Sequence, residues 1–241
     1  TKAENIQFKP GNMRSVMMRI VMIGPFPPPV HGMSLANQMV FEGLSDHHSV
    51  EVINTITGNR IGNVSNMGRF SFLKAFSSIK QIAVGILKIL FTRKAEIVYV
   101  TPAQSVVGYL KYTPFMWAAR IRKIPRYIHI HGGYFRTMYD GLSGWKKRVI
   151  DRSLRGLAGA IVLGPSLRFM FEGLIPDEKI FVCENGVEDE VFATEEEIRQ
   201  KIERYKTDDT IRVVYLSNLM ESKGILDLFE AVKMLRNRGE K

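Results

Sequence analysis

Two loops of the sequence place histidine beside glycine, a combination that suits contact with a polar substrate. The first, at 24–34, is rich in proline and carries His31 and Gly32 just before an expected helix. Because glycine has no side chain, a ligand can approach the helix N-terminus closely, and the free N–H groups there favour an anion. The alternative is a turn stiffened by proline that binds nothing. The loop contains neither GxGxxG nor GK[ST], which excludes a dinucleotide fingerprint and a P-loop.

The second loop follows an apolar segment at 126–131 and reads His131-Gly132-Gly133. His129 and His131 are two positions apart, so both point to the same face of the expected strand. One of them can be a buried structural histidine that donates to a backbone carbonyl. His131 is the stronger functional candidate, because the glycine pair beside it leaves room for a substrate.

Two later loops carry weaker signals. Asn185 and Gly186 form an Asn-Gly pair, which usually marks only a turn. Asn218 and Lys223 lie in the loop before a helix, where the charge of the lysine opposes the helix dipole. A bound phosphate would explain this placement, since the ammonium group and the helix N–H groups could both contact it. The alternative is a solvent-facing side chain, the commoner state of any single lysine.

These loops separate segments that alternate between strand and helix patterns. We expect strands at 19–24, 50–54, 97–100, 126–131, 160–163 and 179–182, and helices at 34–44, 70–91, 105–122, 145–155 and 166–173. Such alternation predicts an α/β fold with a doubly wound, Rossmann-like parallel sheet. Ligands of such sheets bind at the carboxyl ends of the strands, which is where the histidine–glycine loops lie.

The chain divides into three expected parts. Residues 1–16 are polar and form a flexible tail, and 17–206 form the Rossmann-like domain. Residues 207–241 contain one expected strand, 211–216, and one amphipathic helix, 224–238. One strand and one helix cannot bury both of their faces, so we interpret this part as the incomplete start of a second α/β domain. We expect it to pack against another copy of the chain or to be poorly ordered.

The composition is that of a globular protein from a reducing compartment. The chain has 241 residues, is 45% hydrophobic and carries 34 basic against 24 acidic side chains, a net charge of +10. This balance favours an acidic partner such as nucleic acid, anionic lipid or a phosphate-bearing substrate. A single cysteine, Cys183, excludes a disulfide scaffold, and no clustered Cys/His pattern suggests zinc. The sequence shows neither a secretory signal nor an apolar stretch long enough to cross a bilayer.

Basic residues gather in three segments. In the first segment aromatic residues accompany them. This pattern suits docking on anionic lipid headgroups, and the alternative is a solvated face over an ordinary amphipathic helix. The clusters are spread over several helices and match no nucleic-acid-binding motif. They comprise Lys74, Lys80, Lys88, Arg93 and Lys94; Arg120, Arg122, Lys123 and Arg126; and Lys146, Lys147, Arg148, Arg152 and Arg155.

In this order the motifs resemble those of the retaining, GT-B-fold glycosyltransferases of family 4. The resemblance covers roughly 18–240 and rests on the proline-rich loop, the HGG loop, the segments Ile175–Ile180 and Asn185–Val187, and the Lys223–Gly224 helix start. It implies transfer of a sugar, with retention, from a nucleotide-sugar donor to a glycan or lipid-linked acceptor, as in polysaccharide or lipopolysaccharide biosynthesis. It further implies an acceptor-side first domain, a donor-binding second domain, and no required metal or other cofactor.

The resemblance assigns the sugar side of the site to the first domain. His131 matches the family's histidine near the transferred sugar and is the expected catalytic residue. Gly132, Gly133 and Asn185 accompany it on the acceptor and sugar side, together with His31. Retention in this family is attributed to front-face attack, so we assign no protein nucleophile.

The resemblance also assigns contacts to the donor diphosphate. Gly32 matches the second glycine of the family's loop, and His31 stands in place of the first. Lys223 matches the lysine of the family's diphosphate clamp. Asn218 occupies the position of the family's arginine, so phosphate binding there is expected to be weaker. The family's Glu-x7-Glu motif is absent from these 241 residues, so we expect no sugar transfer from them alone.

Two other classes of function stay open. A sugar- or nucleotide-binding module without catalysis is favoured because His31 and Asn218 differ from the glycine and the arginine of the family's motifs. A basic nucleic-acid-binding α/β protein would share the charge but is disfavoured by the missing motifs. For the glycosyltransferase we expect a cytoplasmic protein at the inner face of a membrane, with an anionic membrane surface and a second copy of the chain as further partners.

Overall fold

The computed structural model describes residues 17–56, 72–91, 95–186, 192–208, 210, 212–217 and 221–239. The tail expected at 1–16 and Asn218 lie outside the described residues. The chain divides into two compact units, Thr1–Asn185 and Gly186–Lys241.

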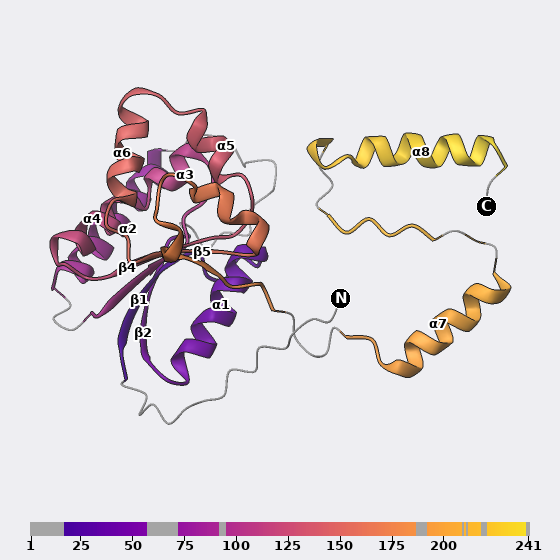
Figure 1. The fold of residues 1–241 in the computed structure, drawn as a ribbon, viewed down its shortest axis with the longest axis horizontal. Helices are drawn as coiled ribbons and strands as arrows, with labels where there is room; N and C mark the ends of the chain where they lie inside the picture. The colour runs from indigo at the N-terminus through magenta and orange to yellow at the C-terminus, as the bar shows by residue number, and fades with distance from the viewer. Residues whose placement is uncertain are drawn as a thin grey trace. The chain divides into compact units, whose positions relative to one another are not determined.

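Six parallel strands form one sheet in the first unit (Figure 1). Their order is β2-β1-β3-β4-β5-β6, and every neighbouring pair is parallel. The fold class predicted from the sequence is therefore confirmed, and each of the six expected strands is present with ends that shift by one residue at most. The strands are β1 (Arg19–Gly24), β2 (Ser49–Asn54), β3 (Ile97–Val100), β4 (Arg126–Ile130), β5 (Gly159–Val162) and β6 (Ile180–Val182).

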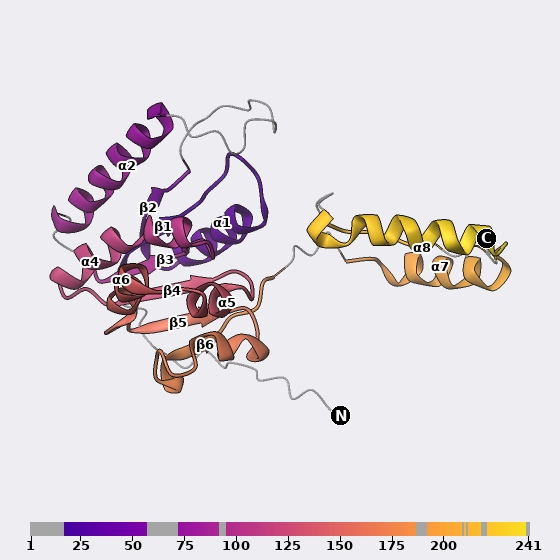
Figure 2. The same ribbon diagram turned by 90° about the horizontal axis from the view of Figure 1, so that it is seen from above.

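Helices pack on both faces of this sheet (Figures 1 and 2). On one face, Phe41 and Leu44 of α1 pack against the buried cluster that contains Met22 of β1. On the other face, α2 to α6 surround a larger core in which Phe115 and Phe135 are fully buried. Burial of each such side chain stabilises the fold by about 1.5–3 kcal/mol. The helices are α1 (Gly32–Ser45), α2 (Phe72–Phe91), α3 (Val106–Leu110), α4 (Thr113–Ile121), α5 (Phe135–Asp140), α6 (Gly144–Leu154), and the short 3-10 turns η2 (Pro165–Phe171) and η3 (Asp177–Lys179).

Three helical segments differ from the sequence-based expectation. The single helix expected at 105–122 is divided into α3 and α4, with Pro114 in the first turn of α4. Proline is tolerated there because the N–H that it lacks would have no partner, whereas inside a longer helix it removes a hydrogen bond. The α-helix expected at 166–173 is the 3-10 turn η2. Helix α5 was not expected at all, although Phe135 and Tyr139 share its buried face.

The second unit contains α7 (Glu195–Thr207), the 3-10 turn η5 (Glu221–Lys223) and α8 (Ile225–Asn237). The strand expected at 211–216 is wrong, because the described residues 212–216 form no strand and have no pairing partner. A strand requires a neighbour to satisfy its backbone groups. No residue of α7 is buried. The division between the units after Asn185 lies before this helix, earlier than the boundary expected after residue 206.

Arg126 is buried and does not belong to a basic surface, which corrects the second of the three expected clusters. Its side chain is 2% exposed. The guanidinium donates to the carbonyl oxygens of Met116 at 2.9 Å, Arg155 at 3.0 Å and Gly156 at 2.9 Å. Burial lowers the pKa of Arg126, and the hydrogen bonds that its N–H groups donate to these backbone oxygens compensate for the lost solvation. Arg126 thus joins α4 to the turn between α6 and β5.

Candidate functional site

The two histidines of the HGG loop lie on the same face of β4, as expected, but in different surroundings. His129 is 2% exposed and forms a 2.5 Å hydrogen bond between its Nδ1 and the hydroxyl of Tyr99 on β3. His131 follows the last residue of β4, and its ring centroid lies 4.0 Å from that of His129. His129 is therefore anchored in the core, and His131 stands at the carboxyl edge of the sheet.

Burial keeps both imidazoles neutral. It lowers the pKa of His129 to about 3, with a further contribution from His131. It also lowers the pKa of His131, while the nearby Asn185 amide acts in the opposite direction. Neither ring nitrogen of His131 has a hydrogen-bond partner among the described residues. Both ring nitrogens are buried, and a neutral imidazole donates from one nitrogen and accepts at the other, so a hydroxyl group that reached the ring could bind in either sense.

Gln104 fixes the conformation of the HGG loop, and the sequence did not single it out. Its Nε2 donates to the carbonyl oxygen of His131 at 2.8 Å, and its Oε1 accepts from the N–H of Tyr134 at 2.6 Å. Gly132 has a φ of +134°, and a Cβ there would lie 2.5 Å from Gln104 Nε2. The backbone conformation therefore requires glycine at position 132, and a side chain there would also displace the Gln104 amide. A glutamine just after a strand has no distinguishing sequence pattern, so only the structure reveals this contact.

A second set of buried contacts fixes the start of the proline-rich loop. Asn37 on α1 is fully buried, and its Nδ2 donates to the carbonyl oxygen of Pro25 at 2.9 Å and to Thr101 Oγ1 at 2.8 Å. A Cβ on Gly24 would collide with Thr101 Oγ1, so the close approach of these groups requires glycine. From β2, Asn54 Nδ2 donates to the carbonyl oxygen of Phe26, and its Oδ1 accepts from the N–H of the same residue. The loop is thereby attached to both strands that flank β1.

His31 serves as the N-cap of α1. Its Nδ1 accepts from the N–H of Ser34 at 3.3 Å, and its own N–H donates to Ser34 Oγ at 2.9 Å, which completes a capping box. Gly32 is exposed, and a Cβ there would meet no atom within 4 Å. Within the described part of the chain, the N–H groups of Gly32 and Met33 have no acceptor. The open N-terminus of this 14-residue helix can therefore accept an anion.

The remaining expected site residues are distributed between the two units. Asn185 is exposed and ends the first unit, near His131. Gly133 is exposed, and a Cβ there would lie 3.3 Å from Leu167. Lys223 belongs to the second unit, where its side chain is exposed and its carbonyl oxygen accepts from the Tyr215 hydroxyl at 3.1 Å.

Two further properties concern the whole described part of the chain. No group of three or more His, Cys, Asp or Glu side chains in it could hold a metal ion. Over the same residues, no helix is long and apolar enough to cross a membrane.

No protein-family model matches this chain, and no curated protein sequence matches it either. Among solved structures, Phytolacca americana UGT2 complexed with UDP-2-fluoro-glucose and pterostilbene is similar with a TM-score of 0.44 and 12% sequence identity. The similar region covers 71% of this chain and 54% of that one, so this chain spans about half the length of that protein.

Proposed function

We propose that the first unit is the acceptor-side domain of a retaining, GT-B-type glycosyltransferase similar to family 4, which uses a nucleotide sugar. The observation that carries this proposal is His131: a neutral imidazole with both nitrogens unpaired, at the carboxyl edge of a parallel sheet and near Asn185. Sugars present many hydroxyl groups that both donate and accept hydrogen bonds. Gln104 holds the backbone on each side of Gly132, so His131 is presented to the substrate in a fixed position.

The N-terminus of α1 is proposed to contact the donor diphosphate. The N–H groups of Gly32 and Met33 supply oriented donors, and the missing side chain at Gly32 permits close approach. Lys223 is proposed as a further diphosphate contact, together with Asn218 five residues earlier in the sequence. Positive charge and N–H groups favour departure of the nucleoside diphosphate, since negative charge develops there as the sugar gains oxocarbenium character. The nucleotide sugar is a substrate, and we propose no metal or organic cofactor.

Substitution of His131 tests the proposed reaction. In a protein that joins this unit to a complete donor-binding domain, His131→Ala is expected to lower sugar transfer by about tenfold or more, because a polar contact to the transition state is lost. His47→Ala removes an exposed histidine elsewhere in the same unit and is the matched control. Circular dichroism would establish that both variants fold. Transfer by His131→Ala at the rate of the control would remove His131 from the site and refute the proposal.

We further propose that α2 docks on an anionic membrane, where a lipid-linked acceptor would be presented. Val84, Leu87 and Phe91 are exposed and spaced three or four residues apart along α2. Lys80 and Lys88 are exposed on the same helix, and Lys88 also pairs with Glu51 at 2.9 Å. An exposed apolar stripe flanked by lysines suits the boundary between lipid headgroups and acyl chains. Such docking would place the protein on the inner face of the membrane.

Liposome flotation tests this docking. The protein is expected to float with phosphatidylglycerol vesicles at low salt and to be released as the salt concentration rises. Leu87→Gln should weaken this binding, whereas Phe229→Gln, on an exposed apolar position of α8, should not. Absence of binding at low salt, or equal loss in the two variants, would contradict the assignment to α2.

A further inference from the structure

A cavity of about 360 Å³ lies on the first unit, away from the loops described above. It is formed between α4 and α6, which lie side by side (Figures 1 and 2). Its volume falls within the range of about 300–1,000 Å³ that is typical of ligand pockets. The polar part of its lining consists of two tryptophans, three arginines and one aspartate: Trp117, Trp145, Arg148, Arg152, Arg155 and Asp151.

The arginines are available to a ligand. Arg148, Arg152 and Arg155 are exposed and spaced three or four residues apart, so they follow one face of α6 and its C-terminal end. Within the described residues, none of the three forms an ion pair with a carboxylate. Their backbone is nevertheless held in place, because the carbonyl oxygens of Arg152 and Arg155 accept from the guanidinium groups of Arg120 and Arg126.

The two tryptophans contribute apolar surface to the cavity wall, and one of them also has a buried hydrogen-bond donor. The indole Nε1–H of Trp117 is buried and has no acceptor among the described residues. Buried polar groups in proteins are nearly always hydrogen-bonded, so this donor lacks its usual partner. The side chain of Trp145 is 60% exposed at the same cavity. An anion with several acceptor oxygens would complement the guanidinium forks, and the buried, unpaired indole donor belongs to the wall beside them.

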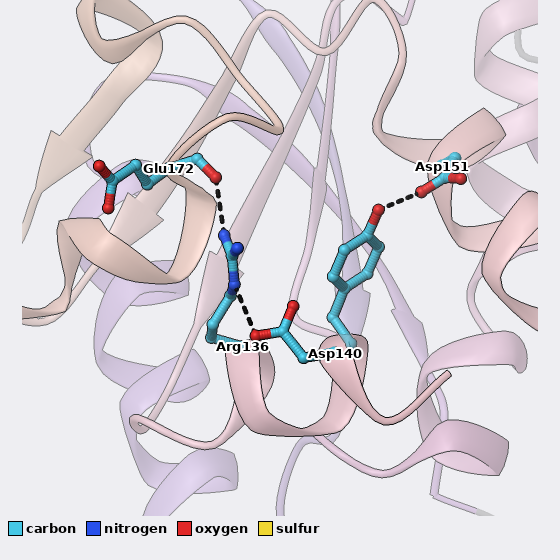
Figure 3. Close-up of polar contacts among 5 residues, drawn as sticks. Arg136, Asp140, Asp151 and Glu172 are labelled. Atoms are coloured by element: carbon cyan, nitrogen blue, oxygen red, sulfur yellow. Dashed lines mark hydrogen bonds and ion pairs between the residues drawn. The ribbon is translucent and has the colours of Figure 1, made fainter. Parts of the chain in front are cut away.

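The single carboxylate of the cavity is already engaged. Asp151 Oδ1 accepts from the hydroxyl of Tyr139 on α5 at 2.5 Å (Figure 3). On α5 itself, Arg136 donates to Asp140 at 2.9 Å and to the carbonyl oxygen of Glu172 at 2.7 Å, which fixes this helix from the other side. Asp151 thus forms part of the wall between α5 and α6, and the three arginines leave the cavity with a positive charge.

We propose that this cavity binds a phosphate group, carried either by a soluble phosphorylated compound or by a phospholipid headgroup. The two sources share one chemistry: a negatively charged phosphate whose oxygens accept from guanidinium N–H groups. The site is separate from the HGG loop, and its existence does not depend on the proposed sugar transfer.

Tryptophan fluorescence reports on this site directly, because the chain has two tryptophans and both line the cavity. Titration with pyrophosphate at constant ionic strength is expected to change the emission and to saturate. Arg152→Gln and Arg155→Gln should each weaken binding by about three- to tenfold through loss of one charged donor. Asp151→Asn should tighten binding, because it removes the opposing charge and keeps an oxygen for Tyr139. Arg199→Gln, an exposed arginine of α7, is the matched control and should leave binding unchanged.

Vesicles distinguish the two sources of phosphate. If the ligand is a lipid headgroup, phosphatidylglycerol vesicles shift the emission to shorter wavelength, phosphatidylcholine vesicles do not, and Arg152→Gln requires about three- to tenfold more lipid for the same shift. If the ligand is soluble, pyrophosphate saturates the signal and the vesicles leave it unchanged. Fluorescence that responds to neither probe would overturn the proposal. Equal weakening by Arg199→Gln and Arg152→Gln would also overturn it, since the effect would then reflect net charge alone.

Discussion

Similar sequences adopt different structures in the two units of the chain. In the first unit, Arg19–Gly24 forms a strand that pairs with β2 on one side and β3 on the other, and its residues after Arg19 are buried. In the second, residues 212–216 have the same basic-then-apolar pattern but form no strand. Their Val214 and Leu216 are 77% and 93% exposed. An apolar pattern therefore indicates a strand only where neighbouring strands satisfy its backbone and cover its side chains.

The same contrast holds for the helices. Phe135 of α5 is fully buried in the core of the first unit, whereas Phe229 of α8 is 60% exposed. Within the second unit, α7 has no buried residue and α8 has one, Ile225. Stability in the first unit should therefore depend on individual apolar side chains, and stability in the second should be insensitive to them.

The largest expected effect comes from paired truncations of these two phenylalanines. Phe135→Ala should lower the free energy of unfolding by about 3–5 kcal/mol, because it leaves a cavity in the core. Phe229→Ala should change it by less than about 0.5 kcal/mol, as is usual at exposed positions. Urea unfolding is followed by circular dichroism, which reports on the helices of both units, and by tryptophan fluorescence, which reports on the first unit because both tryptophans lie in it. Similar losses in the two variants would show that the contrast in burial is wrong.

The next effect is a loss of stability at acidic pH that is confined to the first unit, which holds all five histidines. The pKa of His129 is about 3 in the fold, against about 6.5 in the unfolded chain. Below pH 6.5 His129 therefore binds a proton in the unfolded state but not in the folded state, and the free energy of unfolding falls as the pH decreases towards 3. At pH 5 this residue alone should cost about 2 kcal/mol relative to neutral pH.

Replacement of this histidine measures the effect. His129→Gln should make the difference in unfolding free energy between pH 7 and pH 5 smaller by about 2 kcal/mol, because glutamine does not titrate. His47→Gln, at an exposed histidine, is the matched control and should retain the full difference. The assignment would be contradicted if the His129 variant lost as much stability on acidification as the unaltered protein.

A smaller effect is expected from the contact that holds the HGG loop. Gln104→Ala removes hydrogen bonds to His131 and Tyr134 and should lower the free energy of unfolding by about 1–2 kcal/mol. The local effect should be clearer, with faster hydrogen exchange at the amides of Gly132 to Tyr134 and unchanged exchange in β1. Gln38→Ala, at an exposed side-chain contact with Glu42, serves as the control. Unchanged exchange in the loop would mean that Gln104 does not hold it.

The sheet could be predicted because each strand carries its own signal. Short apolar runs ended by loops were enough to find six strands and their parallel arrangement, since helical segments separate them. Helix α5 was not predicted, although the spacing of its buried residues Phe135, Met138 and Tyr139 is typical of a helix. The prediction of a strand at 211–216 was wrong because the local apolar pattern carries no information on whether a partner strand is present.

The candidate site could be predicted only in part. His131, Gly132 and Gly133 were found because histidine and paired glycines are unusual at a strand end. Gln104 and Asn37 were not found, since their roles depend on contacts between loops that are distant in the sequence. His31 was expected near the sugar, yet its side chain caps α1, a role that the Ser34 three residues later could have suggested.

The smallest expected change in stability is that of Gly32→Ala, and it distinguishes Gly32 from Gly24 at the carboxyl edge of the sheet. Gly32→Ala should alter the free energy of unfolding by less than about 0.5 kcal/mol, because an added Cβ meets nothing and alanine suits a helix. Gly24→Ala should cost about 1–3 kcal/mol through its collision with Thr101. If a diphosphate binds at α1, only Gly32→Ala combines unchanged stability with weaker nucleotide-sugar binding. Unaltered binding in that variant would remove Gly32 from the site.

The most direct test of the central claim is nuclear magnetic resonance of histidine- and glycine-labelled protein, with the first unit joined to a complete donor-binding domain, during titration with uridine, guanosine and adenosine diphosphate sugars. If the carboxyl edge of the sheet is a nucleotide-sugar site, one of these compounds should shift the imidazole signals of His131 and the amides of Gly132 and Gly133 in a saturable way. The exposed His47, in the same unit, should not respond. If none of the compounds shifts His131, or if His47 shifts equally, the sheet edge is not the site and the proposed function is contradicted.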